Sequence, residues 1–335
     1  MVAPIILVAT LAGAALSGVS GKNIYDAHKN NNEAKSVNAD ANTLVANINL
    51  QLDAERQSAN EALQQLGKLK IDILNKNIEN FIENFQRIKN VDFEELCLSD
   101  DANKLQIEEQ AIEELKLMSS VAKDIATGIG AGATIGAVMA FGAYSGTMCL
   151  GVASTGTAIA TLNGVAASNA TLAFLGGGSI AVGGAGVAGG LMILGGLVTI
   201  PALTVFACFT NNQAKKNKEE AYINLAKAQE YVEAMELVKA NCRNVTESAK
   251  LFGEKLKVLR AIFTAFEEKF EDILCYTGAN WAEYTTEQKN DIAVCLTVLK
   301  ALKAMIGHSL LNENGEVNEL EQMIQQCNEL EIKYK

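Results

Sequence analysis

An uncharged stretch in the middle of this chain constrains its fold more than any other feature. Residues 125–214 contain no Asp, Glu, Lys, Arg or His over 90 consecutive positions, and they hold 19 of the chain's 27 glycines. One bilayer crossing needs only about 20 apolar residues, so the run is much longer than a single transmembrane helix. It is also too rich in Gly, Ala, Ser and Thr to be an ordinary lipid-facing helix throughout. The run therefore predicts a membrane-competent segment of an unusual kind.

Composition divides this run into three parts. The first, residues 125–150, has glycines four apart, which put small residues on one helix face and let a second helix approach closely: Gly128, Gly132 and Gly136, then Gly142 and Gly146. The middle, residues 151–178, is rich in Ser, Thr and Asn and suits a turn, a re-entrant segment or the lining of a lumen. The third, residues 179–209, is the most apolar and carries Gly186 and Gly190 as further packing positions.

Insertion free energies rank the first and third parts. The third part has thirteen Leu, Ile, Val and Phe residues, which sum to roughly -4 to -8 kcal/mol on an insertion scale. The first part has six, which sum to roughly -2 to -4 kcal/mol before glycine is set against them. We therefore expect the third part to insert readily and the first part to be marginal.

Basic residues predict the topology of the run. Lys123 precedes it, and Lys215, Lys216 and Lys218 follow it. Because basic residues stay on the cytoplasmic side of a membrane, both ends favour the same side, and the run is predicted to form a hairpin. An apolar stretch at residues 2–20 ends before Lys22 and is interpreted as an uncleaved membrane helix. The alternative is an apolar helix that caps a soluble bundle.

The flanking segments show helical periodicity. Apolar residues recur at steps of three and four over residues 34–91 and again over residues 215–274, which is typical of long amphipathic helices. We expect the two helices to pair in a coiled-coil-like manner, with a bend at Gly67. A helix around residues 105–121 is expected to continue into the run. Trp281 is placed in a loop, Thr285 or Thr286 caps a helix that ends at Gly307, and a last helix spans residues 317–330.

The predicted fold is all-α: a long coiled-coil-like helical bundle or stalk with a glycine-rich hydrophobic membrane hairpin. The segments are an N-terminal apolar helix (1–21), long amphipathic helices (22–124), the hairpin (125–214), a second long amphipathic helix (215–275) and short C-terminal helices (276–335).

Composition argues against several classes of function. A net charge of -11 and a pI near 4.9 disfavour a nucleic-acid partner, because phosphate binding depends on Lys and Arg. The seven cysteines are scattered without a CxxC pair, so we expect no metal site or disulfide framework. A GxGxxG match at residues 184–189 lacks the acidic residue about 20 positions on that a dinucleotide site needs. With only two histidines, His28 and His308, no catalytic centre is apparent. We therefore expect no enzyme activity, no cofactor and no small-molecule substrate.

Two segments of the sequence resemble those of a known group of proteins. ASTGTAIATLNGVAASNATLAFLGGGSIAVGGAGVAGGLMILGGLVTIPAL (153–203) and ALQQLGKLKIDILNKNIENFIENFQRIKNVDF (62–93) resemble a widespread family of bacterial glycine-rich proteins that are mostly uncharacterised. The resemblance covers the chain to about residue 240 and implies a bacterial source, but no activity or site residues. The architecture is also similar to that of α-helical pore-forming toxins, in which a hydrophobic hairpin hides against a helical bundle or enters a bilayer.

These patterns predict a membrane-inserting helical protein whose glycine-zipper hairpin oligomerises and forms a pore, as in a toxin or a defence effector. The expected partners are a lipid bilayer and further copies of the chain. The expected location is the bacterial cytoplasmic membrane, with most of the chain in the cytoplasm, or a soluble form that inserts on a trigger. The alternative is a membrane-anchored coiled-coil scaffold that does not permeabilise the bilayer.

Overall fold

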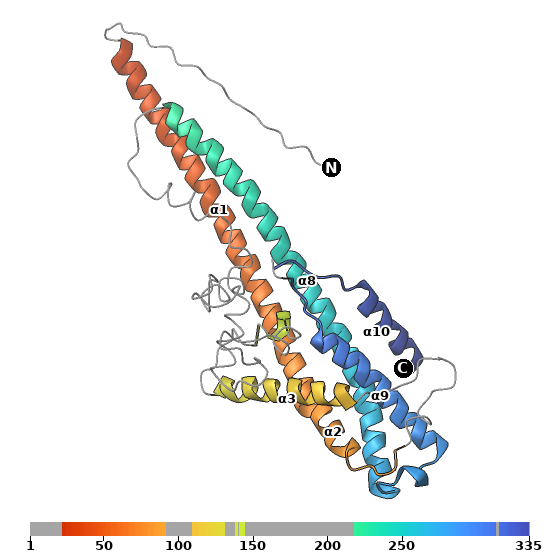
Figure 1. Ribbon diagram of the computed structural model, residues 1–335. Coiled ribbons are helices and arrows are strands. Elements are labelled where there is room, and N and C mark those ends of the chain that lie inside the picture. The colour runs from red at the N-terminus through yellow and green to blue at the C-terminus, as the bar shows by residue number, and fades with distance from the viewer. Residues whose placement is uncertain are drawn as a thin grey trace. The chain divides into compact units, whose positions relative to one another are not determined.

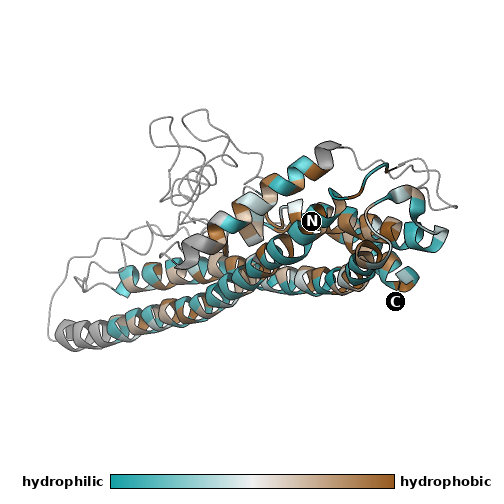
Figure 2. Cartoon of the chain, turned by 90° about the horizontal axis from the view of Figure 1, so that it is seen from below, coloured by the Kyte–Doolittle hydropathy of each residue, from teal (hydrophilic) through white to brown (hydrophobic). Residues whose placement is uncertain are grey.

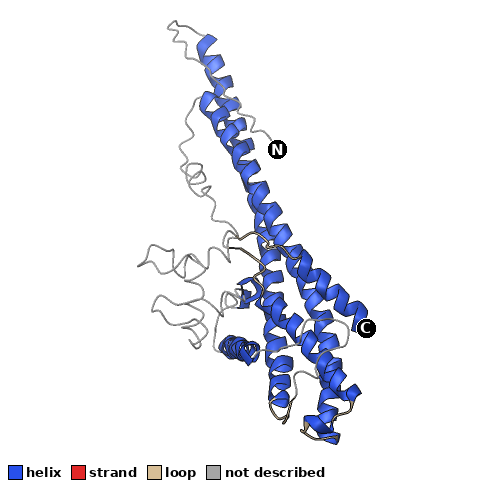
Figure 3. Cartoon of the chain, turned by 45° about the vertical axis from the view of Figure 1, so that its right-hand side comes forward, coloured by secondary structure: helices blue, strands red, loops and turns tan. Residues whose placement is uncertain are grey.

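The computed structural model describes residues 22–91, 109–130, 138–139, 141–144, 218–312 and 315–334. Among these residues the regular elements are all helices, and the only β pairing is at isolated bridges; Figure 3 shows helices joined by loops. The predicted all-α fold is therefore confirmed for this part of the chain. None of its helices combines the length and the apolar composition that a membrane crossing requires.

The helices follow the two periodic segments of the sequence. Their order is α1 (Lys22–Asp72), the π-helix η1 (Ile73–Ile78), α2 (Glu79–Phe85), α3 (Glu109–Gly130), α8 (Lys218–Tyr276), the 3-10 turn η4 (Trp281–Glu283), α9 (Thr286–Gly307) and α10 (Glu321–Tyr334), as Figure 1 shows. Hydrophilic and hydrophobic residues alternate along both long helices in Figure 2. This is the amphipathic pattern that lets one face of each helix bury against the other.

The long helices α1 and α8 run parallel to each other. The chain forms two compact units, residues 1–47 with 202–233 and residues 48–201 with 234–335. In the first unit the hydrogen-bonded pair Glu33 and Tyr222 lies 189 positions apart. In the second unit Gln51 and Lys239 lie 188 positions apart, and so do Glu55 and Arg243. A constant difference in residue number means that both helices point the same way, since an antiparallel pair would keep the sum constant.

The first unit is built on small residues. Ala34 and Val37 of α1 pack with Ala221 of α8, and Ala41 and Val45 pack with Ala228. Alanine at these positions favours the helix and fills little space. An ion pair of 2.8 Å joins Lys218 to Glu33 at the start of α8. Lys218 is one of the predicted basic residues after the run, and in this unit its ammonium binds a carboxylate of α1.

The second unit has a larger, aromatic core. Buried apolar side chains of α1, α2 and α8 form it, among them Leu63, Leu66, Phe81, Phe252, Phe263 and Phe270. The ring of Phe81 lies 5.5 Å from that of Phe263 and 5.4 Å from that of Phe270. Burying one such side chain contributes about 1.5–3 kcal/mol. This core fixes α1 and α8 as the support for the elements that pack outside them.

The C-terminal helices of the second unit follow local signals closely. Thr285 caps α9 by accepting a hydrogen bond from Gln288 N, and the Gln288 side chain accepts one from Thr285 N, which completes a capping box. Trp281 lies in the turn before α9 and is buried. The last helix begins at Glu321, not at residue 317 as predicted. Leu311 and Val317 pair as an isolated bridge, and Asn318 N donates to Leu310 O, which keeps this stretch non-helical.

The prediction of a bend at Gly67 did not identify the role of this glycine. Gly67 lies inside the continuous helix α1. The irregularity of α1 occurs six residues later, where η1 begins at Ile73.

Candidate functional site

The most constrained contact in the second unit is a crossing of two backbones at Gly67 and Gly142. A Cβ atom added to Gly67 would lie 1.9 Å from the carbonyl oxygen of Val138, and one added to Gly142 would lie 2.3 Å from the carbonyl oxygen of Leu63. Real Cβ atoms do not approach that closely, so only glycine fits at either position. Gly142 belongs to the uncharged run, so the run touches the bundle through one of its predicted packing glycines.

The residues around this crossing are buried within the second unit. We call residues 138, 139 and 141–144 the docked residues; they are helical. Their side chains are at most 7% exposed, and those of Phe141 and Ala143 are fully buried. Apolar burial of this extent is a substantial favourable contribution. In this state, therefore, part of the first segment of the run is covered by protein.

Lys70 holds the docked residues from the side of α1. Its side chain is completely buried, and its Nζ donates to the carbonyl oxygens of Gly142 and His308, each at 3.2 Å. Nζ also lies 5.3 Å from the centroid of the Phe252 ring, in cation–π geometry. Burying an ammonium is costly unless hydrogen bonds replace its water. Lys70 thus ties three elements to one another: α1, the docked residues and the loop after α9.

The loop after α9 closes over the docked residues. Leu311 N donates to Ala143 O at 3.2 Å, and Leu310 and Leu311 are buried. The loop is itself anchored, because Asn318 Nδ2 donates to Ser309 O at 2.8 Å and Asn241 Nδ2 of α8 donates to Gly315 O at 3.0 Å. The docked residues are therefore held between α1 on one side and residues 308–311 on the other.

Burial perturbs the titratable groups of this site. The desolvation of His308 lowers the pKa of its imidazole, and the Lys70 ammonium lowers it further. The ring of His308 stacks on that of Phe252 with centroids 6.1 Å apart. The site therefore contains a histidine that resists protonation beside the Lys70 ammonium.

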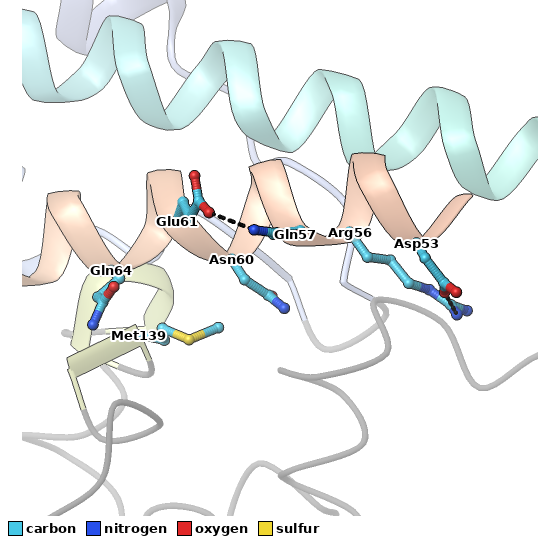
Figure 4. Close-up of a pocket in the computed structure, with 7 residues that line it drawn as sticks. All are labelled: Asp53, Arg56, Gln57, Asn60, Glu61, Gln64 and Met139. Carbon is cyan, nitrogen blue, oxygen red and sulfur yellow. Dashed lines mark hydrogen bonds and ion pairs between the residues drawn. The ribbon is translucent and has the colours of Figure 1, made fainter. Parts of the chain in front are cut away.

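A polar hollow lies beside the docked residues. It measures about 400 Å³ and is lined by Asp53, Arg56, Gln57, Asn60, Glu61, Gln64 and Met139. In Figure 4 the side chain of Met139 lies next to the polar face of α1, near Gln64. Its walls are mostly hydrophilic side chains of one helix, so the hollow has no constellation of a catalytic type.

A second polar cluster lies between η1 and α8. Asn77, at 8% exposure, accepts from Arg260 Nε at 2.9 Å and donates to Glu267 Oε2 at 3.3 Å. Asn80 donates to Glu267 Oε1 at 3.1 Å. Burial raises the pKa of Glu267 despite these two hydrogen bonds, which lower it. The cluster provides hydrogen bonds to Asn77 of the π-helix and joins η1 and α2 to α8, and we interpret it as structural.

Few of the predicted packing and topology residues are described. Gly128 lies in α3, which runs into the uncharged run as far as Gly130, as predicted. Lys123 of α3 forms an ion pair with Glu79 of α2. Lys22 is the first residue of α1. The remaining predicted residues lie outside the described part of the chain: Gly132, Gly136, Gly146, Gly186, Gly190, Lys215 and Lys216. The N-terminal segment 1–21 and most of the hairpin lie outside it as well.

Sequence reasoning missed Lys70, although a signal was present. Leu66, Lys70 and Ile73 follow one another at steps of four and three, so Lys70 occupies a core position of the helical period. A lysine at a core position of a helix is usually interpreted as a break in the apolar stripe that the packing accommodates. Here it is the residue that binds the carbonyl oxygens of Gly142 and His308.

Comparison with known proteins adds no relative. No family model, no curated protein sequence and no solved structure matches the chain. The resemblance to bacterial glycine-rich proteins stays a prediction. Within the described residues no group of three His, Cys, Asp or Glu side chains is placed to hold a metal ion, and the cysteines described there (Cys242, Cys275, Cys295 and Cys327) form no disulfide.

Proposed function

We propose that this chain is a membrane-inserting helical protein with two states. In one state the docked residues, which belong to the first part of the glycine-zipper hairpin (residues 125–214), pack against α1. In the other state the hairpin enters a bilayer, where copies of the chain oligomerise through the small-residue face and form a pore. The proposed location is the bacterial cytoplasmic membrane, or a soluble form that inserts on a trigger.

The crossing of Gly67 and Gly142 carries this proposal. Gly142 lies on the small-residue face that suits helix packing in a bilayer, and in the docked state the same face is used against α1. This helix face packs against α1 in the docked state and is suited to pack against another copy of the chain in a bilayer. The use of one face in both arrangements supports an exchange between the docked and the inserted state. The proposal would have no such support if Gly142 faced away from the rest of the chain.

The energies of the two states are of the same order. Burial of Val138, Met139 and Phe141 contributes roughly 5–9 kcal/mol to docking. Insertion of the first and third parts of the run contributes roughly 6–12 kcal/mol. Apolar burial is thus favourable in both arrangements, and conditions that weaken one of them shift the population towards the other.

Dye release from liposomes tests the proposal. Gly132→Leu combined with Gly136→Leu places two bulky side chains on the small-residue face, and we expect it to abolish leakage while circular dichroism shows unchanged helical content. The control is Thr134→Leu, which places a leucine in the same segment two positions away from each glycine, off that face of a helix. If purified wild-type protein releases no dye under any lipid composition or pH, pore formation is refuted.

A second candidate is a membrane-anchored scaffold that organises the bilayer without permeabilising it. The parallel pairing of α1 and α8 favours this alternative, because long paired helices suit a spacer or an assembly surface. Vesicles that become clustered or tubulated without dye release would support the scaffold and contradict the pore.

A further inference from the structure

The uncharged run leads from α3, which lies against η1, back to the start of α8. Because α1 and α8 are parallel, the chain must return along α1 between these points, whereas antiparallel helices can be joined by a tight turn. Within the second unit, Ser119 Oγ of α3 donates to Leu74 O at 3.5 Å, and Lys239 Nζ, near the start of the α8 segment, donates to Gln51 Oε1 at 2.8 Å. Leu74 and Gln51 are 23 positions apart, which is about 35 Å at the helical rise of about 1.5 Å per residue.

An inserted hairpin brings its two ends together. Two packed helices lie about 8–10 Å apart, and the lysines on both sides of the run favour the same face of the bilayer. Residues 210–217, between the apolar third part of the run and α8, reach at most about 27 Å when extended. This length covers no more than the path inside the second unit, and it leaves nothing for the stretch of α8 that is paired in the first unit. For the hairpin to insert, therefore, either α3 or the start of α8 must leave its present partner.

These two segments are attached very unequally. The side chains that α3 buries include four large apolar ones: Leu115, Met118, Val121 and Ile125. Ion pairs also join α3 to α2 and to α9. Over residues 218–233 of α8, by contrast, the buried side chains are those of Ala221 and Ala228, while Tyr222 and Ile223 are 47% and 53% exposed. Because hydrophobic stabilisation scales with the apolar area removed from water, the start of α8 separates from α1 more easily than α3 separates from the second unit.

The polar contacts of the first unit fix its register but resist opening only weakly. Lys218 Nζ lies 2.8 Å from Glu33 Oε1, and Tyr222 Oη donates to the same oxygen at 3.0 Å. Water and salt screen such exposed pairs, so they add little stability. Asn224 Nδ2 donates to Asn38 Oδ1 at 3.1 Å, and a polar pair between paired helices specifies their register. The first unit is therefore suited to separate and to pair again in the same alignment.

We propose that the first unit opens when the hairpin enters a bilayer: residues 218–233 of α8 separate from residues 33–45 of α1, while the second unit stays paired. Together with residues 210–217, the released stretch forms a tether that reaches up to about 80 Å when extended. This inference rests on the proposed function, because it names the part of the bundle that moves so that residues 125–214 can insert.

A cross-link across the first unit tests whether opening is required. Ala34→Cys and Ala221→Cys place two thiols in one packed cluster, in a background whose seven native cysteines are replaced by alanine. A bismaleimide with a cleavable disulfide joins the two thiols. We expect this cross-link to slow dye release from liposomes by at least about tenfold, and a reductant to restore the rate.

The matched control is a cross-link between the same two helices in the second unit. Glu55→Cys and Arg243→Cys replace an ion pair of 2.6 Å between α1 and α8, in the same background and with the same reagent. Because the second unit stays paired, we expect dye release within about twofold of the rate without a cross-link. Folding of each variant is checked by the hydrogen-exchange protection of α8.

Hydrogen exchange of the wild-type protein tests the opening without any substitution. Peptides covering residues 34–45 and 221–231 are followed in buffer and after addition of vesicles of phosphatidylcholine and phosphatidylglycerol. We expect these peptides to be protected in buffer and to lose protection with vesicles. Peptides covering residues 112–125 of α3 and residues 252–270 of α8 are expected to keep theirs.

Three results would overturn the opening. One is dye release by the protein cross-linked in the first unit as fast as without the cross-link. Another is protection of residues 34–45 and 221–231 that vesicles leave unchanged, or that is already absent in buffer. The third is loss of protection in α3 while the first unit keeps its own, since α3 would then be the segment that moves.

The two assays separate the failure of the opening from the failure of the proposed function. Loss of protection in the first unit on vesicles, without dye release from any protein, supports the opening and refutes the pore. Dye release that the first-unit cross-link does not slow supports the pore and refutes the opening.

Discussion

Replacing Gly67 by alanine tests whether the glycine crossing holds the docked residues. The new Cβ would lie 1.9 Å from Val138 O, whereas ordinary van der Waals contact begins at 3.4 Å, so the docked backbone must retreat by about 1.5 Å. The obstacle is a backbone atom, so no change of rotamer relieves the clash. A retreat of this size breaks the hydrogen bond from Lys70 Nζ to Gly142 O, which is already 3.2 Å long.

The expected loss is large at the docked residues and small elsewhere. A hydrogen bond from a charged group contributes about 1.5–3 kcal/mol, and the packing of Val138 and Phe141 contributes about 1.5–3 kcal/mol each. Docking therefore loses up to roughly 5–9 kcal/mol. In α1 itself, alanine is more favourable than glycine by about 1 kcal/mol. The pairing of α1 with α8 is expected to survive.

Hydrogen exchange distinguishes these effects within one molecule. We expect Gly67→Ala to lower protection of the peptide covering residues 138–144 by more than about a hundredfold, while peptides from α8 keep theirs. Gly253→Ala is the matched control, because its added Cβ meets only the side chains of Leu66 and Leu69, at 3.9 and 4.0 Å. That variant should remain docked and gain a few tenths to 1 kcal/mol of stability. Unchanged protection at residues 138–144 in Gly67→Ala, or an equal loss in Gly253→Ala, would refute the reasoning.

Two further predictions concern the rest of the second unit. Thr285→Ala removes the capping box of α9 and is expected to lower the free energy of unfolding by about 1 kcal/mol in urea denaturation, whereas Thr286→Ala, one residue into the helix, should cost less than half as much. Because the pKa of Glu267 is raised in the folded state, its contribution to stability is present at low pH and is lost as the pH rises through that pKa. We expect Glu267→Gln to flatten this decline in urea titrations at successive pH values, and an unchanged slope would contradict the assignment.

The sequence predicted the helices well because their signals are local. Periodicity located α1, α8 and the continuation of α3 into the uncharged run, and Thr285 and Gly307 marked α9 through capping and termination. These features depend on residues a few positions apart. The start of α10 was misplaced by four residues because the pairing of Leu311 with Val317 is invisible to helical periodicity.

Only part of the candidate site could be predicted from local sequence patterns. Gly142 was identified as a packing glycine, but its partner Gly67 was interpreted as a bend, because a lone glycine in a helix does not reveal which backbone approaches it. Lys70 and His308 are 238 positions apart, and no spacing rule joins them. Nor did the pattern give the direction of the pairing between α1 and α8, since an apolar stripe is the same whether its partner is parallel or antiparallel.

The parallel arrangement of α1 and α8 also determines the order in which contacts become available while the chain is made. Gln51 meets its partner Lys239 only after a further 188 residues, which takes roughly 10–40 s at ordinary rates of synthesis. Lys70 meets Gly142 after only 72, and the shorter loop costs about 0.8 kcal/mol less to close. The docked residues are thus synthesised after α1 and before α8. A nascent chain therefore has the means to shelter part of its uncharged run on α1 before the ribosome has finished the second long helix.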